Sequence, residues 1–185
     1  MIAAEDLDRR LAAYRPAGPD EEESLARIRA LVRDAPDPFT RDERDHVTAS
    51  AVVARPDGSA FLLVHHRRLD RWLQPGGHVE PDDASVFEAA RREAREETGV
   101  EDLAAPFGDL VLDVDVHPIP ARAGRPAHVH FDLRHLLTAT ATRFTVAQEE
   151  VRRAEWFSFD AALAAGVDPS LSRALSKARA LLGGI

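Results

Sequence analysis

The segment Arg92–Val100 reads REAREETGV and places three glutamates on one predicted helix. Glu93, Glu96 and Glu97 occupy positions i, i+3 and i+4, so they share one helical face. Like charges at this spacing destabilise a helix by about 0.2–0.5 kcal/mol per pair. Either water screens this repulsion, as on an ordinary solvated face, or a cation lies among the carboxylates.

An apolar stripe of Phe87, Ala90 and Ala94 lies beside the glutamates and predicts that the helix packs against a sheet. The carboxylates would then lie at the rim of a cleft rather than in bulk water. Carboxylate oxygens in that position suit a hard divalent cation such as Mg²⁺, which keeps several waters and substrate phosphate oxygens as further ligands. The spacing alone leaves the solvated face and the metal site both open.

The composition limits the classes of protein to consider. The chain has 185 residues, of which 44% are hydrophobic, enough for one domain with a packed core and an extension. A net charge of −8 argues against a nucleic-acid polymer as partner, because binding the phosphate backbone requires Lys/Arg patches. The absence of cysteine excludes disulfides, cysteine–zinc sites and a thiol nucleophile. No signal-peptide pattern or membrane-length apolar run is found, so we expect a cytoplasmic protein with no membrane partner.

The N-terminal region predicts two amphipathic helices within residues 1–34, and Asp20 with Glu23 fits a capping box at the start of the second. We therefore expect an N-terminal helical extension at 1–40 and the main domain at 41–185. The apolar stripes of the extension require a partner surface. They predict either packing on their own domain or a contact in a homodimer.

The main domain mixes strands and helices without regular alternation, which favours an α+β sandwich with a mixed sheet. Two apolar runs flank the pair Asp57-Gly58 and predict a β-hairpin. The segments DLVLDVDVH and HVHFDLR alternate apolar and polar residues, as half-buried strands do. The expected elements after the hairpin are a glycine-started loop (GGHVEPDD), strands at 109–117, 128–134 and 155–159, and helices at 84–98, 160–165 and 169–182.

Together with its flanks, this segment resembles the motif of the Nudix hydrolase family. That motif reads glycine, five residues, glutamate, seven residues, then Arg-Glu, an apolar residue, any residue, Glu-Glu, any residue, glycine and an apolar residue. REAREETGV matches the second half at each fixed position, and LQPGGHVEP upstream is similar to the usual entrance loop of the family. The resemblance covers residues 46 to about 165. It implies a Nudix-type α/β/α sandwich with a mixed β-sheet.

The first acidic position of the motif departs from the family pattern. Five residues after Gly77 stands Asp83 rather than glutamate, and eight residues instead of seven separate it from Arg92. Asp83 or Ser85 could cap the helix, and Ser85 with Glu88 fits a capping box. The departure motivates an alternative function, a Nudix-fold ligand-sensing or scaffold module without turnover. The intact second half of the motif argues against it, because a binding module has least need of that part.

The resemblance implies a hydrolase that cleaves the diphosphate linkage between a nucleoside and another group by water attack at phosphorus. Mg²⁺ or Mn²⁺ would link the acidic protein to its anionic small-molecule diphosphate. Glu96 or Glu97 would also help to deprotonate the water, and Arg92 would orient a glutamate, with Glu96 as its i+4 partner. By resemblance, the metal ligands are Glu93, Glu96, Glu97 and the carbonyl oxygen of Gly77. A Nudix-fold isomerase is discounted, because such enzymes rely on a cysteine.

The resemblance also leaves several choices open. Glu149 and Glu150 are candidates for an acidic group from a later loop, and the sequence neither chooses between them nor separates this role from that of ordinary solvated residues. We expect substrate contacts from His78, Trp72 and Arg134. The substrate class stays open among nucleoside triphosphates, nucleotide sugars or ADP-ribose, and non-nucleotide diphosphates.

Eight histidines in a cysteine-free chain raise zinc binding as a further alternative. His65 and His66 are adjacent on a predicted strand, so they point to opposite faces and cannot bind one ion together. His128 and His130 share a face. We interpret these histidines as substrate contacts or hydrogen-bonded sheet residues rather than as metal ligands.

Overall fold

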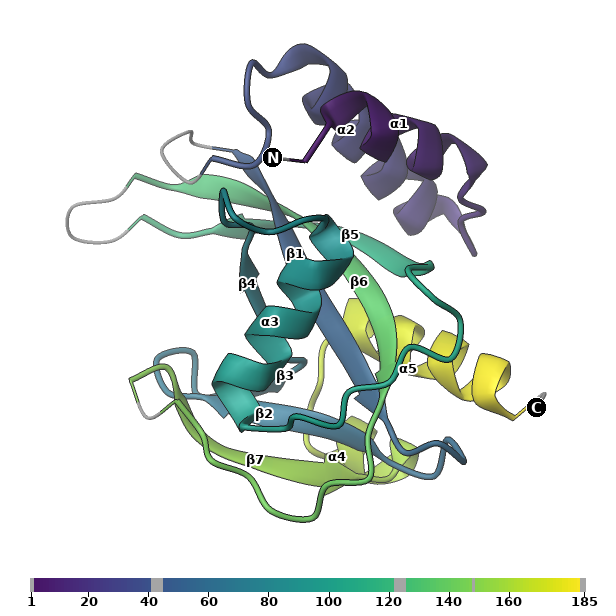
Figure 1. Ribbon diagram of the computed structural model, residues 1–185, viewed down its shortest axis with the longest axis vertical. Helices are drawn as coiled ribbons and strands as arrows, with labels where there is room; N and C mark the ends of the chain where they lie inside the picture. The colour runs from purple at the N-terminus through teal and green to yellow at the C-terminus, as the bar shows by residue number, and fades with distance from the viewer. Residues whose placement is uncertain (1, 41–44, 122–125, 148, 184–185) are drawn as a thin grey trace.

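A computed structural model describes residues 2–40, 45–121, 126–147 and 149–183. Within these ranges, a curled mixed sheet lies between helices on its two faces, with a pair of N-terminal helices at one edge (Figure 1). The predicted α+β sandwich with an N-terminal helical extension is therefore confirmed.

The element order follows the sequence prediction, with two short strands added. Residues 76–78 were expected in a loop, but they pair with the first strand of the sheet. The helices are α1 (Ala4–Ala13), α2 (Pro19–Asp34), α3 (Val86–Thr98), α4 (Phe159–Ala164) and α5 (Pro169–Leu182). The strands are β1 (His46–Ala54), β2 (Phe61–His66), β3 (Arg71–Leu73), β4 (Gly76–His78), β5 (Val111–Ile119), β6 (His128–Thr138) and β7 (Val151–Phe157).

Strand β1 is the centre of the sheet. One edge pairs in parallel with β6 along its whole length, from His46 opposite His130 onward. The other edge pairs antiparallel first with β4 and then with β2, which follows the predicted Asp57-Gly58 turn. Gly58 has a φ of 68°, the left-handed conformation that favours glycine in such turns. The short strand β4 therefore brings Gly76 and Gly77 against the middle of the central strand.

Both faces of β1 are covered, so all nine of its residues are buried. Val47, Ala49, Ala51 and Val53 belong to the core on the side of α3. The alternate residues face α4 and α5, where Val52 and Ala54 join a second apolar core. Near the start of β1, this second face carries polar residues: His46, Thr48 and Ser50.

The α1–α2 pair packs on its own domain. Leu7, Leu11, Ile28 and Val32 are buried in the same apolar cluster as β1 and α3. Of the two expectations for this segment, packing on its own domain is therefore the one that the structure shows. The predicted capping box at Asp20 is wrong: Pro19 is the first residue of α2, and Gly18 precedes it without a side-chain cap. Proline fits the first helical turn, because its missing N–H would have no helical partner there.

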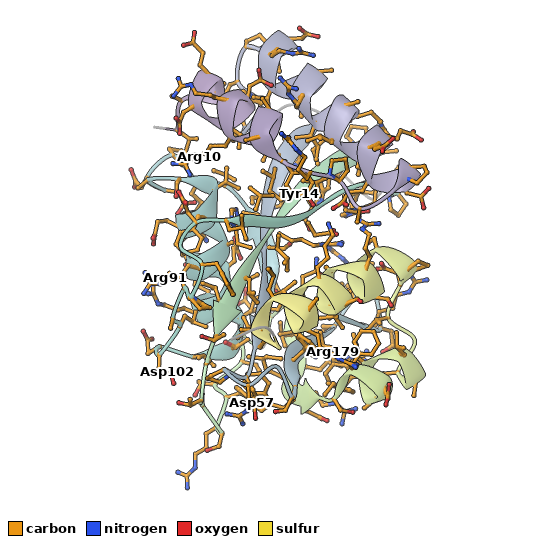
Figure 2. The ribbon with its side chains drawn as sticks, turned by 90° about the vertical axis from the view of Figure 1, so that its right-hand side faces the viewer. Arg10, Tyr14, Asp57, Arg91, Asp102 and Arg179 are labelled. Atoms are coloured by element: carbon orange, nitrogen blue, oxygen red, sulfur yellow. The ribbon has the colours of Figure 1, made fainter. Side chains whose placement is uncertain are left out.

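A buried charge cluster joins the N-terminal helix pair to α5. Glu21 accepts hydrogen bonds from the hydroxyl of Tyr14, the main-chain N–H of Ala17 and the ammonium group of Lys177. Figure 2 shows Tyr14 between the helix pair and α5, and Lys177 donates to its hydroxyl at 2.7 Å. Burial alone would raise the pKa of Glu21, but Lys177 and Tyr14 outweigh it and lower the pKa to about 2.

We expect Lys177→Met to destabilise the fold by about 3–5 kcal/mol, because it removes the nearest cation from the buried Glu21 carboxylate and leaves Arg173, which lies 4.0 Å away. Urea unfolding at neutral pH measures the effect. The depressed pKa of Glu21 means that the contribution of this pair is present above pH about 4.5 and is lost as the pH falls through about 2. Arg179→Met, at an exposed position of the same helix, is the control and should cost under about 1 kcal/mol. Equal losses from the two substitutions would contradict the assignment.

Candidate active site

Helix α3 begins at Val86, two residues after the predicted start, and ends at Thr98 as predicted. Ser85 is the N-cap and its hydroxyl accepts a hydrogen bond from the main-chain N–H of Glu88 at 3.1 Å. Gly99 ends the helix in the left-handed conformation, with a φ of 69°. Phe87 and Ala90 are buried against the sheet. These local signals fix the rotation of α3, so that its glutamate face turns toward β4.

The glutamates of α3 approach the main chain of β4 very closely. Glu97 is 5% exposed, and its Oε2 accepts a hydrogen bond from the N–H of Gly76 at 3.0 Å. A Cβ atom on Gly77 would lie 2.6 Å from the carboxylate of Glu93. A side chain at Gly77 would therefore push the Glu93 carboxylate out of this position. The main chain and the two carboxylates form one compact polar group.

Burial makes these carboxyls weak acids. It raises the pKa of Glu93 to about 7, although the nearby Arg92 acts in the opposite direction. It raises the pKa of Glu97 to about 8, against the hydrogen bond from Gly76. The charges of Glu96 and Glu150 raise both values further. Carboxylate oxygens are the donors that a hard divalent cation prefers, and the charge of such an ion would offset the repulsion between these groups.

Arg92 organises the site. Its guanidinium donates to both carboxylate oxygens of Asp83, at 3.1 and 3.0 Å, and to the carbonyl oxygen of His78 at 2.9 Å. A further N–H group lies 3.0 Å from both Glu93 and Glu96, so the expected i+4 contact with Glu96 is present. Asp83 is 8% exposed and does not cap the helix. The unusual first acidic residue therefore holds Arg92 in place.

The loop residue Glu150 contributes negative charge to the electrostatics of the site. Its charge raises the pKa of both Glu93 and Glu97. The sequence does not distinguish Glu149 from Glu150, because the loop conformation decides how near each carboxylate comes to α3. Glu96 lies at the open side of the group, with 57% of its side chain exposed.

The structure does not bring the three expected substrate contacts together. Trp72 packs edge-on against Phe157 and His65, with ring centroids 4.6 and 4.9 Å away. Arg134 is 2% exposed and is surrounded by carboxylates on the α5 side of the sheet. The polar strand face is covered at Arg134, so this side chain lies in the interior. The ring of His78 turns toward other histidines, and only its carbonyl oxygen contacts Arg92. Their contacts with substrate stay predictions.

A histidine cluster lies on the sheet face opposite α3. The ring of His46 lies 5.0–5.5 Å from those of His78, His128 and His130, and His117 lies 5.6 Å from His130. Burial, followed by the charges of the surrounding histidines, lowers the pKa of His130 to about 2. The sequence did not predict this cluster, because its members come from four strands and only His128 and His130 share one. The pairing of β1 with β4 and β6, and of β6 with β5, brings them together.

Comparison with known proteins identifies the class. The NUDIX domain model matches residues 44–177. Among curated proteins, none matches this sequence. A MutT Nudix hydrolase from Burkholderia pseudomallei is 25% identical, with a TM-score of 0.52 over 73% of this chain and 98% of that one. A Nudix-family hydrolase from Clostridium perfringens is also 25% identical, with a TM-score of 0.52 over 76% and 97%. An Ap4A hydrolase from C. elegans is 20% identical, with a TM-score of 0.53 over 75% and 98%.

This chain belongs to the Nudix family. It is a Nudix-type diphosphohydrolase, an enzyme that acts on phosphoanhydride bonds, so the predicted family and enzyme class are confirmed. Members of this family generally use a divalent metal ion and act on small molecules. Among the described residues, no helix is long and apolar enough to cross a membrane.

Asp83→Asn should lower kcat/KM by about 10–100-fold, because it weakens the charged contact that positions Arg92 beside Glu93 and Glu96. Asp82→Asn is the matched control at the neighbouring, exposed position and should leave kcat/KM unchanged. The measurement is steady-state hydrolysis of the best substrate found for the wild-type chain. A full-strength Asp83→Asn enzyme would contradict the positioning role.

The raised pKa values of Glu93 and Glu97 predict a pH-dependent effect of Mg²⁺ on stability. Between pH about 4.5 and about 8, the metal-free folded chain holds protons that the unfolded chain releases, so its stability falls as the pH rises. A bound cation replaces these protons. Mg²⁺ should therefore raise the unfolding midpoint more at pH about 8 than at pH about 6 in urea titrations. A pH-independent Mg²⁺ effect would contradict this.

Proposed function

We propose that this enzyme is a Mg²⁺- or Mn²⁺-dependent hydrolase of a small organic diphosphate, of the kind in which a nucleoside diphosphate is linked to another group. The observation that supports it is the close packing of Glu93 and Glu97 against Gly76 and Gly77. A diphosphate is strongly anionic, and the chain carries a net charge of −8. Electrostatics therefore favours a cation between enzyme and substrate.

The metal ligands in this proposal are Glu93, Glu96, Glu97 and the carbonyl oxygen of Gly77. When bound, the metal ion would neutralise phosphate oxygens and make water a better nucleophile. Oxygen donors are the ligands that Mg²⁺ and Mn²⁺ prefer, so the residues present fit these ions. Glu150 adds a negative charge close to the same group.

The protein side chains position the carboxylates and accept the proton of the attacking water. Arg92 holds the carboxylates of Glu93 and Glu96 in fixed positions, and Asp83 holds Arg92. Glu96 or Glu97 accepts a proton from the attacking water. The attack at phosphorus breaks one phosphoanhydride bond and leaves two phosphate-bearing products.

The organic part of the substrate stays open. The C. elegans protein is named as an Ap4A hydrolase, and a protein from E. coli, 19% identical with a TM-score of 0.53, as a dihydroneopterin triphosphate pyrophosphohydrolase. At these identities the likeness shows the fold alone. Stacking by Trp72, contacts from His78 and Arg134, a homodimer and a cytoplasmic location remain predictions from the sequence.

The structure removes the reason for considering a ligand-sensing or scaffold module without turnover. That alternative was based on Asp83 in place of glutamate, and Asp83 still forms a two-oxygen contact with Arg92. The inserted residue therefore leaves the contact between the first and second halves of the motif intact.

A substrate panel tests the proposal. The purified chain, with Mg²⁺ added, is incubated with nucleoside triphosphates, nucleotide sugars, ADP-ribose and non-nucleotide diphosphates, and phosphate-bearing products are measured. Glu97→Gln should lower kcat by at least about 100-fold on the best substrate, because it removes a charged oxygen ligand but keeps an acceptor for Gly76. Chelation of the metal should abolish turnover.

Glu101→Gln is the matched control. Glu101 is two residues beyond the end of α3, and its side chain is 84% exposed. This variant should keep the wild-type kcat and metal requirement. Turnover that survives both chelation and Glu97→Gln would overturn the proposal.

A further inference from the structure

Three histidines from three strands bring their ring nitrogens together on the face of the sheet opposite α3. His46 begins β1, His78 ends β4 and His130 lies on β6, and a ring nitrogen of each lies within 4.8 Å of the other two. The strand register produces this meeting. His46 lies directly opposite His130, and His78 lies opposite Thr48, two residues further along β1. Residues opposite one another, or two apart on a strand, project from the same face.

We propose that His46, His78 and His130 form a binding site for a transition-metal ion of the zinc class, separate from the carboxylate site on α3. Imidazole nitrogens suit such ions, whereas Mg²⁺ prefers oxygen. Zinc with Zn–N distances of about 2.0–2.1 Å places tetrahedral ligand nitrogens about 3.3 Å apart. The ring nitrogens lie up to 4.8 Å apart in the structure, so they need to approach one another by about 1.5 Å to bind one zinc ion. Rotation of the histidine side chains supplies this movement.

His128 is the candidate fourth ligand. Its Nε2 lies 3.2 Å from the Nε2 of His130, close to the separation expected between two ligands of one zinc ion. Its Nδ1 lies 3.2 Å from the carbonyl oxygen of Pro126. A proton on this Nδ1, donated to the carbonyl oxygen, would place the lone pair on Nε2. Metal-binding histidines are commonly held in this way by a main-chain carbonyl.

The two sites lie on opposite faces of the same short strand. Gly77 faces Glu93 of α3, and His78, the next residue, faces the histidine cluster because side chains alternate along a strand. The carbonyl oxygen of His78 also accepts a hydrogen bond from Arg92. An ion bound to the His78 ring therefore joins β4 to β1 and β6 and fixes the main chain beside Glu93. In this site the His78 ring binds metal rather than substrate.

Zinc titration of the full chain tests the site. The chelator-treated protein is titrated with Zn²⁺ by calorimetry in the presence of excess Mg²⁺, which occupies the oxygen site. We expect one tightly bound Zn²⁺ per chain. His78→Gln and His130→Gln should each raise its Kd at least about 100-fold, since each removes a direct ligand. Circular dichroism and urea unfolding without metal confirm that each variant folds.

Two comparisons decide between the sites. His65→Gln removes a histidine of β2 outside the cluster and should bind Zn²⁺ like the wild type. Glu97→Gln should also keep the zinc site, although it removes a ligand of the proposed Mg²⁺ site. Loss of Zn²⁺ binding in Glu97→Gln, or unchanged binding in both His78→Gln and His130→Gln, would overturn the proposal.

Cobalt gives an independent readout that does not depend on activity. Co²⁺ bound by the histidines in tetrahedral geometry should give visible absorption in the wild-type chain, and His130→Gln should lose it. If His78→Gln does not fold, the absorption and affinity of His130→Gln decide the question. Wild-type protein that shows only the spectrum of octahedral Co²⁺ would contradict a nitrogen-ligated tetrahedral site.

Discussion

The close approach of the α3 carboxylates to the main chain of Gly76–Gly77 is the contact on which this site depends. A Cβ at Gly77 would lie 2.6 Å from the Glu93 carboxylate and would displace it. The approach buries two carboxyls and makes their ionised forms unfavourable. The fold keeps this arrangement because Arg92 supplies one positive charge and the N–H of Gly76 one hydrogen bond. A divalent cation would supply the remaining positive charge.

The parts of the fold that could be predicted from the sequence are those set by neighbouring residues. The Ser85 cap, the Gly99 end and the glutamate spacing of α3 depend on a few adjacent positions, and the structure confirms all three. The Asp20 cap failed although it also looked local, because Pro19 one residue earlier fits the first turn better. The role of Asp83 was not predictable, since it requires the preceding loop to fold back onto Arg92.

The polar faces of β5 and β6 show a second limit of sequence patterns. Strict alternation correctly predicted strands with one polar side, but it does not say what covers that side. In the structure Asp113, Asp132 and Arg134 are buried, and Arg173 and Lys177 of α5 pair with Asp113. The polar side of β5 and β6 is thus partly an internal network of ion pairs rather than a solvent-exposed surface. The histidine cluster continues the same face toward the start of β1.

The contact between Tyr14, Glu21 and Lys177 has a consequence for how the chain is made. Tyr14 and Lys177 are 163 residues apart, and Glu21 and Lys177 are 156 apart. Synthesis proceeds from the N-terminus, so α1 and α2 leave the ribosome long before α5 exists. Until then, Glu21 has no cation with which to enter the interior, and the nascent helix pair lacks its final docking partner. The helix pair α1–α2 can therefore form this docking contact only after α5 has been synthesised.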